Sequence, residues 1–362
     1  MAESCGEMKR EIGSIFPLND QQISSVEDKC ASFAEGRIYY SLCREALHDI
    51  ALSHADTNKC VLIPAYTCQT VITPFEEAGW KCQYYSIHTS LRVDVSHLLQ
   101  LVDSYHPSLV VVHPYFGMDL TAEERLAFGT IHNNGAKVVL DLTQCIFSEE
   151  DTSFADYVVG SYRKWFPIPD GGFLIKTEAA KNIIQPEQEN VEFVERELAA
   201  MYLRGQYFGN GELRTKDISI RLSKSADNVA ENNIRPHKMS QVAYNLLQKE
   251  DKIRNQQARK ENFQFLFEHI HDNDKITKVC SSLDNLTSAP LYFTIYVQDR
   301  KALQSELIKD AIYAPVIWPV EDENILINDE VIYIYEHLLA IPCDQRYDVV
   351  DMQRIIEIIR RY

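Results

Sequence analysis

The chain has 362 residues, with 36 Lys and Arg against 53 Asp and Glu, so its formal charge is −17. This acidic excess argues against a protein whose main partner is nucleic acid or an anionic membrane. Hydrophobic residues make up 45% and charged residues 25%, an ordinary globular composition, and the length suggests about two domains.

The nine cysteines are scattered along the chain, and none forms a C-x-x-C pair. An odd number without such spacing is typical of reduced, mostly buried thiols, and we expect neither a disulfide framework nor a metal site. The N-terminal segment lacks the apolar core of a signal peptide, and no apolar run approaches membrane length. These features predict a soluble cytoplasmic protein.

Residues 1–35 are polar and acidic, and we interpret them as an N-terminal arm with one or two short helices. The segment 36–54 predicts an amphipathic helix with Ser41 as its N-cap. The amides of Cys43 and Arg44 would then be free at a helix N-terminus, where a phosphate group can bind. Taken alone, a capped amphipathic helix without a ligand is the simpler interpretation.

Strand and helix patterns alternate over the next part of the chain. Apolar runs predict strands at 60–66, 81–87 and 108–117, and helical patterns follow them at 67–79, 93–105 and 120–135. This alternation is typical of right-handed crossover units on a mostly parallel sheet. The strands are continuously apolar, which indicates a sheet covered on both faces.

The stretch 137–172 places functional groups directly after apolar runs. Asp141 follows Val138-Val139-Leu140, and Ser161 follows a second run at 157–159. Lys164 comes next, among aromatic and proline residues, and Gly171-Gly172 then opens a third run. In open α/β sheets, ligands bind just past the carboxyl ends of the strands.

This pattern raises the hypothesis of a pyridoxal phosphate (PLP) site. A lysine among apolar groups loses its proton more easily, and the neutral amine is the nucleophile that attacks a carbonyl. The PLP aldehyde needs such a lysine, and its ring nitrogen needs a carboxylate such as Asp141. Spacing alone also allows a surface lysine and a carboxylate that only forms a turn or a helix cap.

The second half of the chain has a different organisation. We expect a helical segment at 178–208, a long irregular segment at 209–234 that carries acceptor specificity, and one long amphipathic helix at 235–270. Strands are predicted at 291–297 and 310–318, and helices at 329–338 and 347–362. The domain prediction is an arm at 1–35, a large domain at 36–235 and a small C-terminal domain at 236–362 that includes the long linking helix.

Several landmarks occur together in a fixed order. They are LIPAYT at 62–67, HPYFG at 113–117, VVLDLTQ at 138–144, the spacing from Lys164 to Gly171-Gly172, HKMSQVA at 237–243 and LLAIPCDQRYDVVDM at 338–352. With them the chain resembles the DegT/DnrJ/EryC1/StrS family of PLP-dependent sugar aminotransferases over residues 36–360. The resemblance implies fold type I of the PLP-dependent transferases, an α/β fold with a mostly parallel central sheet in a large PLP-binding domain and a smaller α+β C-terminal domain.

The resemblance also implies roles for individual residues. Lys164 would form the internal aldimine (a Schiff base) and shuttle a proton between substrate and cofactor, while Asp141 would pair with the ring nitrogen. Gln144 would contact the region of the ring hydroxyl, and Ser161 would bind the phosphate together with the amides of Cys43 and Arg44. The ring face would stack on a residue of the stretch 66–68, either Cys68 or Tyr66.

The family resemblance implies an aminotransferase that works as a homodimer. Its amino donor would be an amino acid, with glutamate expected, and its acceptor a keto sugar linked to a nucleotide or a related carbonyl compound. Two alternatives stay open. One is a PLP-dependent lyase, dehydratase or decarboxylase on the same fold, and the other is a non-catalytic binding or regulatory protein that has kept the fold.

Overall fold

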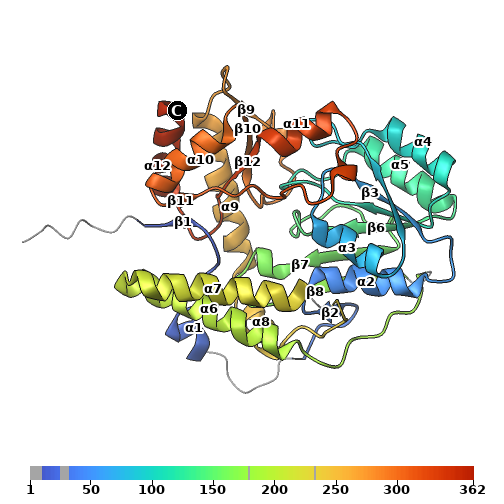
Figure 1. Ribbon diagram of the computed structural model, residues 1–362, viewed down its shortest axis with the longest axis horizontal. Helices are drawn as coiled ribbons and strands as arrows, with labels where there is room; N and C mark the ends of the chain where they lie inside the picture. The colour runs from blue at the N-terminus through green and yellow to red at the C-terminus, as the bar shows by residue number, and fades with distance from the viewer. Residues whose placement is uncertain (1–9, 25–31, 178–179, 232–233) are drawn as a thin grey trace, which may run out of the picture.

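The computed structural model describes residues 10–24, 32–177, 180–231 and 234–362, and its centre is a seven-stranded sheet (Figure 1). The strand order is β2-β8-β7-β6-β5-β3-β4. Only β8 runs opposite to the other six strands, so the sheet is mostly parallel, as the sequence predicts. The strands are β2 (Ile38–Tyr40), β3 (Cys60–Pro64), β4 (Lys81–Tyr85), β5 (Leu109–Val112), β6 (Lys137–Asp141), β7 (Tyr157–Ser161) and β8 (Gly172–Lys176).

Helices cover both faces of this sheet, which explains why β3, β5 and β7 are buried along their whole length. On one face, α2 (Cys43–Ser53) packs against β7, β8 and α3 (Gln69–Glu77). On the other, α4 (Val95–Tyr105) packs on β3 and β4, and α5 (Ala122–Asn133) packs on β6. Figure 1 shows the sheet between these two layers.

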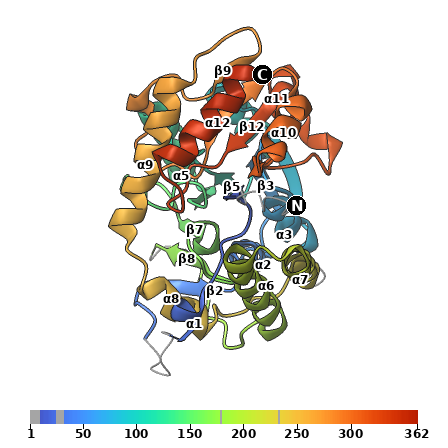
Figure 2. The same ribbon diagram turned by 90° about the vertical axis from the view of Figure 1, so that its left-hand side faces the viewer.

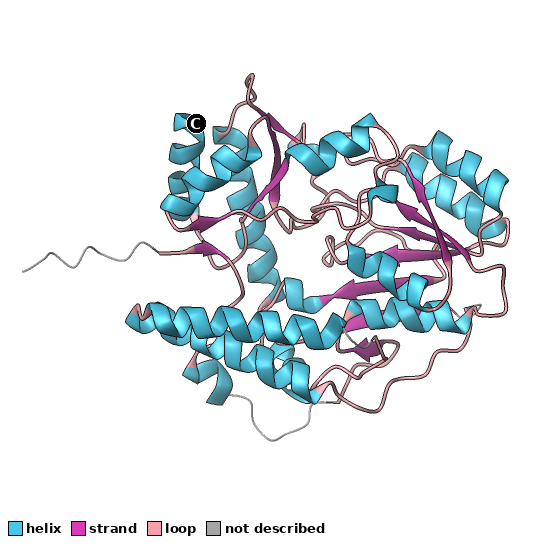
Figure 3. Cartoon of the chain, viewed as in Figure 1, coloured by secondary structure: helices cyan, strands magenta, loops and turns pink. Residues whose placement is uncertain are grey.

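The C-terminal part forms a smaller α+β unit around a three-stranded antiparallel sheet, with the order β12-β10-β9 (Figure 3). Its strands are β9 (Ile276–Lys278), β10 (Phe293–Val297) and β12 (Leu338–Ile341), and its helices are α9 (Lys252–His269), α10 (Arg300–Lys309), α11 (Asp329–His337) and α12 (Val349–Arg361). A separate two-stranded parallel sheet joins β1 (Ile12–Gly13) of the N-terminal arm to β11 (Ile312–Tyr313).

The segment 209–234 is not irregular, and this prediction was wrong. Residues 213–231 form α7 (Leu213–Glu231), which lies beside α6 (Val191–Asn210) in a long hairpin (Figures 1 and 2). The buried residues of α7 are small (Ser219, Ala226 and Ala230), and the Ser219 hydroxyl donates to the Ala200 carbonyl at 2.7 Å. A helix that packs through small side chains shows no apolar stripe in its sequence.

Four other boundaries differ from the sequence prediction. The helix expected at 178–208 is α6, which begins only after its N-cap Asn190. The expected helix at 235–270 is two helices, because Asp251 caps α9 three residues after α8 (Gln241–Gln248) ends. The predicted strand at 310–318 is reduced to β11. Helix α2 begins after Leu42, an extended residue that takes the N-cap position in place of Ser41. The Ser41 amide donates to the His237 carbonyl, and the Ser41 carbonyl accepts from the Gly171 amide.

The described ranges include only part of the N-terminal arm and seven of the nine cysteines. The described part of the arm holds α1 (Asp20–Ser24), whereas residues 1–9 and 25–31 lie outside the described ranges, as do Cys5 and Cys30. The seven cysteines within the described residues are free thiols. In the same residues, no helix has both the length and the hydropathy needed to cross a membrane. The domain boundaries stay a prediction.

Candidate active site

A cavity of about 520 Å³ lies where β5, β6 and β7 end and where α2 begins. Seven of the eight residues singled out from the sequence line it: Cys43, Arg44, Cys68, Asp141, Gln144, Ser161 and Lys164. The eighth, Tyr66, is buried in an aromatic cluster with Tyr115, Trp318 and Tyr335 and is not among the lining residues. The structure therefore brings residues from segments more than 100 positions apart in the sequence into one cavity.

Asp141 is the last residue of β6 and is 5% exposed. Its Oδ1 accepts a hydrogen bond from the Thr143 amide at 2.8 Å. Burial raises the pKa of the Asp141 carboxyl, while the bonds from Thr143 and the charge of Lys164 act in the opposite direction. A protonated ring nitrogen beside this carboxylate would supply the positive charge that a buried anion needs.

Lys164 ends a short 3-10 helix, Tyr162–Lys164, that follows β7 directly. Its aromatic neighbour Trp165 is fully buried and donates its indole N–H to the Thr143 carbonyl at 2.8 Å. Lys164 itself is exposed and lines the cavity. The apolar residues around Lys164 in the sequence thus pack into the core, and they do not enclose the amine as we expected.

The N-terminus of α2 also lines the cavity. Cys43 and Arg44 are the first two residues of this helix, where backbone amides have no partner within the helix. The helix start lies directly against β8, because a Cβ atom on Gly172 would be 2.6 Å from the Cys43 nitrogen. Only glycine at this position lets the helix N-terminus come so close to the strand.

Positive side chains add to this helix N-terminus. Arg44 and Arg163 both line the cavity, and Arg163 lies 3.7 Å from the carboxylate of Asp227 on α7. Burial lowers the pKa of Arg44, and the like charge of Arg163 lowers it further. Two guanidinium groups, the Ser161 hydroxyl and two helix amides are a donor set that suits phosphate.

The side chain of Cys43 has a different environment from its amide. The Thr143 hydroxyl donates to the Cys43 sulfur at 3.8 Å. Burial raises the pKa of the Cys43 thiol, and the nearby Asp141 raises it further. The thiol therefore stays protonated, and the backbone amide is the group that Cys43 can offer to an anion.

His113 and Trp318 also line this cavity, and the sequence left both open between a place in the pocket and a place in the core. His113 is buried, and its pKa is lowered to about 3 by burial and by the charge of Lys164, so the ring is neutral. Its Nε2 lies 3.0 Å from the Thr67 hydroxyl, and its Nδ1 has no partner among the described residues. His113 follows the apolar run that forms β5, and this position is the signal in the sequence that pointed to the pocket. Thr67 follows the strand predicted at 60–66, whereas Trp318, inside the strand predicted at 310–318, comes from a loop.

A second cavity of about 680 Å³ adjoins the first and shares Lys164, Gln144, Arg163, Cys68, Asp227, Ile317 and Trp318 with it. Away from these shared residues, its walls come from α6, α7, the N-terminal arm and the C-terminal unit. Lys164 thus lies between the two cavities. The first offers hydrogen-bond donors that suit a phosphate group and the Asp141 carboxylate, which suits a ring nitrogen. The second is large enough for a substrate.

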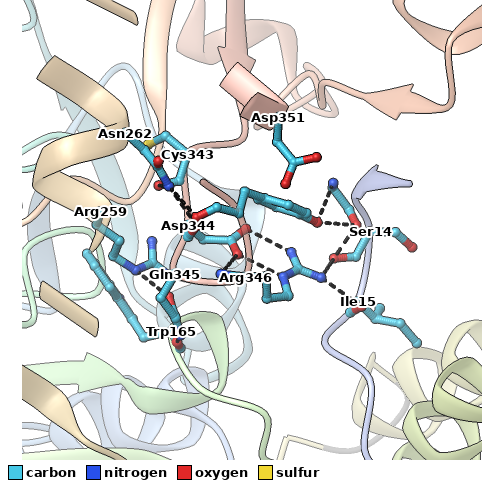
Figure 4. A network of polar contacts seen from close by, with 12 residues as sticks. Ser14, Ile15, Trp165, Arg259, Asn262, Cys343, Asp344, Gln345, Arg346 and Asp351 are labelled. Carbon is cyan, nitrogen blue, oxygen red and sulfur yellow. Dashed lines mark hydrogen bonds and ion pairs between the residues drawn. The ribbon is translucent and has the colours of Figure 1, made fainter. Parts of the chain in front are cut away.

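A polar network orders one wall of the second cavity (Figure 4). The Arg346 side chain donates twice to Asp344 at 2.8 Å and also donates to the carbonyls of Ser14 and Ile15 at 3.2 and 3.1 Å. Arg259 donates to Gln345 at 2.7 Å, and Gln345 donates to the Trp165 carbonyl at 2.6 Å. The network ties the arm, the C-terminal unit and the residue after Lys164 together.

No family model matches the chain, and no curated protein matches it in sequence. Solved structures do match. PseC of Helicobacter pylori, an aminotransferase involved in the biosynthesis of pseudoaminic acid, is 12% identical over 97% of this chain and 99% of PseC, with a TM-score of 0.66. The chain has the fold of an aminotransferase.

Two further structures agree with this fold. Spr1654 of Streptococcus pneumoniae, solved in a PLP form and a PMP form, is 13% identical in its PLP form over 96% of this chain and 97% of its own, with a TM-score of 0.67. DesI, solved in the presence of its TDP-sugar product, is 13% identical over 94% of this chain and 84% of its own, with a TM-score of 0.62. The fold class predicted from the sequence is confirmed.

Proposed function

We propose that this protein is a PLP-dependent aminotransferase that moves an amino group from an amino acid, with glutamate expected, to the carbonyl of a sugar. One observation carries the proposal: Lys164, Asp141 and the N-terminus of α2 line a single cavity. The fold shared with aminotransferases, one of them solved in PLP and PMP forms, supports it.

The residues present fit the cofactor. When bound, PLP supplies an aldehyde for the lysine amine and an electron-withdrawing ring. Asp141 would hold the positive charge of the ring nitrogen, and Gln144 would lie near the ring hydroxyl. Ser161, Arg44, Arg163 and the amides of Cys43 and Arg44 would hold the phosphate.

The remaining roles concern protons and access. The Lys164 amine would take a proton from the substrate Cα and return it at the adjacent reacting carbon, which requires an amine that alternates between its neutral and charged forms. The exposure of Lys164 in the cavity leaves it free to make that movement. Trp318 lines both cavities and would form part of the boundary between cofactor and substrate.

The acceptor proposal is a keto sugar linked to a nucleotide. PseC is involved in the biosynthesis of pseudoaminic acid, and DesI was solved in the presence of its TDP-sugar product. In this chain, the second cavity of about 680 Å³ offers space for such a molecule next to Lys164. A homodimer and a cytoplasmic location complete the proposal, and light scattering of the purified protein would test the dimer.

Absorption spectroscopy of the purified protein with added PLP tests the cofactor and its lysine. We expect a visible band that borohydride fixes irreversibly onto the peptide containing Lys164, and no such label in Lys164→Ala. Glutamate should bleach the band and release 2-oxoglutarate, which a lyase or a decarboxylase would not do. If no band forms, or if the label lies on another lysine, the catalytic proposal fails and a binding or regulatory protein becomes the better interpretation.

A further inference from the structure

A buried charge cluster lies in the second cavity, away from the residues shared with the cofactor compartment. Arg204 of α6 and Lys216 of α7 line this cavity, and both contact the carboxylate of Glu11 in the N-terminal arm. Lys216 donates to Glu11 at 2.5 Å and to the Tyr313 hydroxyl at 2.9 Å, and the Tyr207 hydroxyl donates to Glu11 at 2.8 Å. Two cations therefore share one carboxylate.

The donors in this cluster outnumber its acceptors. Arg204 is 1% exposed, and two of its nitrogens, Nε and Nη1, are buried without a hydrogen-bond partner among the described residues. Its guanidinium also lies over the rings of Tyr207 and Phe208, at 5.4 and 5.2 Å, which cannot accept hydrogen bonds as an oxygen does. The described residues therefore neutralise little of the positive charge of Arg204 beyond its contact with Glu11, and that charge acts on the neighbouring Lys216 and on an anion that Lys216 binds.

The charges that line the whole second cavity also favour an anionic ligand. Its lining includes six cationic side chains, Arg163, Lys164, Arg204, Lys216, Arg259 and Arg346. Only three carboxyl groups line it, Glu197, Asp227 and Asp344. In a chain with a formal charge of −17, a cavity with this excess of positive charge attracts an anionic ligand.

The length of α7 gives the distance between the charge cluster and the region of Lys164. Lys216, Ile220, Ser223 and Asp227 line the cavity from one face of this helix. Lys216 and Asp227 are separated by about 16 Å along the helix axis at about 1.5 Å per residue, and Asp227 is beside Arg163, next to Lys164 in the chain. A five-carbon dicarboxylic acid with bonds of about 1.5 Å cannot span that length.

We propose that Lys216 and Arg204 form an anion subsite that binds a phosphoryl group of an elongated substrate whose carbonyl lies at Lys164. This proposal rests on the proposed function, because it places the far end of the carbonyl acceptor. Lys216 makes the direct contact through its remaining N–H, and Arg204 supplies charge behind it. Arg204 neutralises Glu11, which leaves the charge of Lys216 available to the ligand.

Calorimetric titration of the full-length protein, in the presence of saturating PLP so that the cofactor phosphate site is filled, tests the subsite. The probes are uridine diphosphate, pyrophosphate, uridine and glutarate at one ionic strength. We expect uridine diphosphate to bind the wild type and to bind at least tenfold more weakly to Lys216→Met. Lys216→Arg should retain most of the affinity, because it keeps the charge.

The matched control is Lys224→Met, an exposed lysine on the same helix that does not line the cavity. It should bind uridine diphosphate as the wild type does. Equal binding by the wild type and Lys216→Met overturns the proposal, as does the absence of binding by both phosphoryl probes. Glutarate binding that depends on Lys216, without phosphoryl binding, would overturn the assignment to a phosphoryl group.

The two proposals fail in different ways. A normal Lys164 band with PLP, combined with no effect of Lys216→Met on uridine diphosphate binding, removes the subsite and leaves the aminotransferase. Absence of the Lys164 band, combined with phosphoryl binding that depends on Lys216, removes the aminotransferase and leaves the subsite. Thermal denaturation of each variant separates loss of binding from loss of fold.

Discussion

Ser240 donates both its backbone N–H and its hydroxyl to the carboxyl of Asp170, at 3.0 and 2.6 Å. Ser240 is the N-cap of α8, and Asp170 lies in the loop between Lys164 and β8. The segment from Lys164 to Gly171-Gly172 and the HKMSQVA segment at 237–243 are thus in direct contact, through two residues that are 70 positions apart in the sequence. This contact holds the loop that follows the candidate catalytic lysine.

This contact predicts a pH dependence of stability. Burial raises the pKa of the Asp170 carboxyl from 3.8 to about 7, although the bonds from Ser240 act against it. A carboxyl with a raised pKa in the folded state stabilises the fold fully below about pH 3.8, and its contribution is lost as the pH rises through about 7. Asp170→Asn, which cannot ionise, should therefore show a flatter dependence between pH 5 and pH 8.

Urea denaturation at several pH values in that range measures the effect. The isosteric change Asp151→Asn, at an exposed position, is the control and should follow the wild type. Parallel curves for the wild type and Asp170→Asn would contradict the assigned ionisation.

Asp141→Asn tests the carboxylate at the end of β6. We expect the rate of amino transfer from glutamate to fall by about 100-fold, because the amide carries no charge to stabilise a protonated ring nitrogen. PLP should still bind, since the phosphate donors remain in place. Single-turnover absorption measurements give the rate, and a rate within twofold of the wild type would exclude a charge role for Asp141.

Substitutions at Arg44 and Arg163 test the phosphate end of the site. Arg44→Met and Arg163→Met should each raise the dissociation constant for PLP by about tenfold, because each removes one charge-assisted contact. Pyridoxal, which lacks the phosphate, should bind these variants and the wild type equally. Arg221→Met, at an exposed position of α7, should leave PLP affinity unchanged. Equal losses for PLP and pyridoxal would indicate a general disturbance instead.

Two glycine substitutions compare a tight contact with open space. The Cβ of Gly172→Ala would meet backbone atoms of Leu42 and Cys43, whereas no atom lies within 4 Å of the Cβ of Gly209→Ala. Gly172→Ala should lower the free energy of unfolding by about 1–3 kcal/mol and weaken PLP binding, because α2 must move away from β8. Gly209→Ala, inside a helix, should be neutral or gain up to about 1 kcal/mol. Denaturation curves decide between these outcomes.

Much of the large domain could be predicted from the sequence, for reasons that the structure makes plain. Strands such as β5 and β6 are buried on both faces, so their apolar runs mark them clearly. Asp141 and Ser161 end two neighbouring parallel strands, so their proximity follows from the order of the chain. The sequence therefore predicted which residues line the first cavity better than those that line the second.

The substrate side was much harder to predict. Helix α7 buries Ser219 and Ala226, and such small residues leave no periodic signal. Trp318 reaches the site from a loop far along the chain, and no spacing rule connects it with Lys164. The pairing of Glu11 with Arg204 joins residues 193 positions apart, and only the folded chain shows that they meet.

The pairing of β1 with β11 has a consequence for how the protein folds. Ile12 pairs with Ile312, so this small sheet closes a loop of about 300 residues, a contact with a high entropic cost of closure. During synthesis on the ribosome, β1 emerges about 300 residues before β11, so it cannot complete this sheet until β11 has been made. The wall of the second cavity that contains Gly13 and Phe16 should consequently form among the last steps of folding.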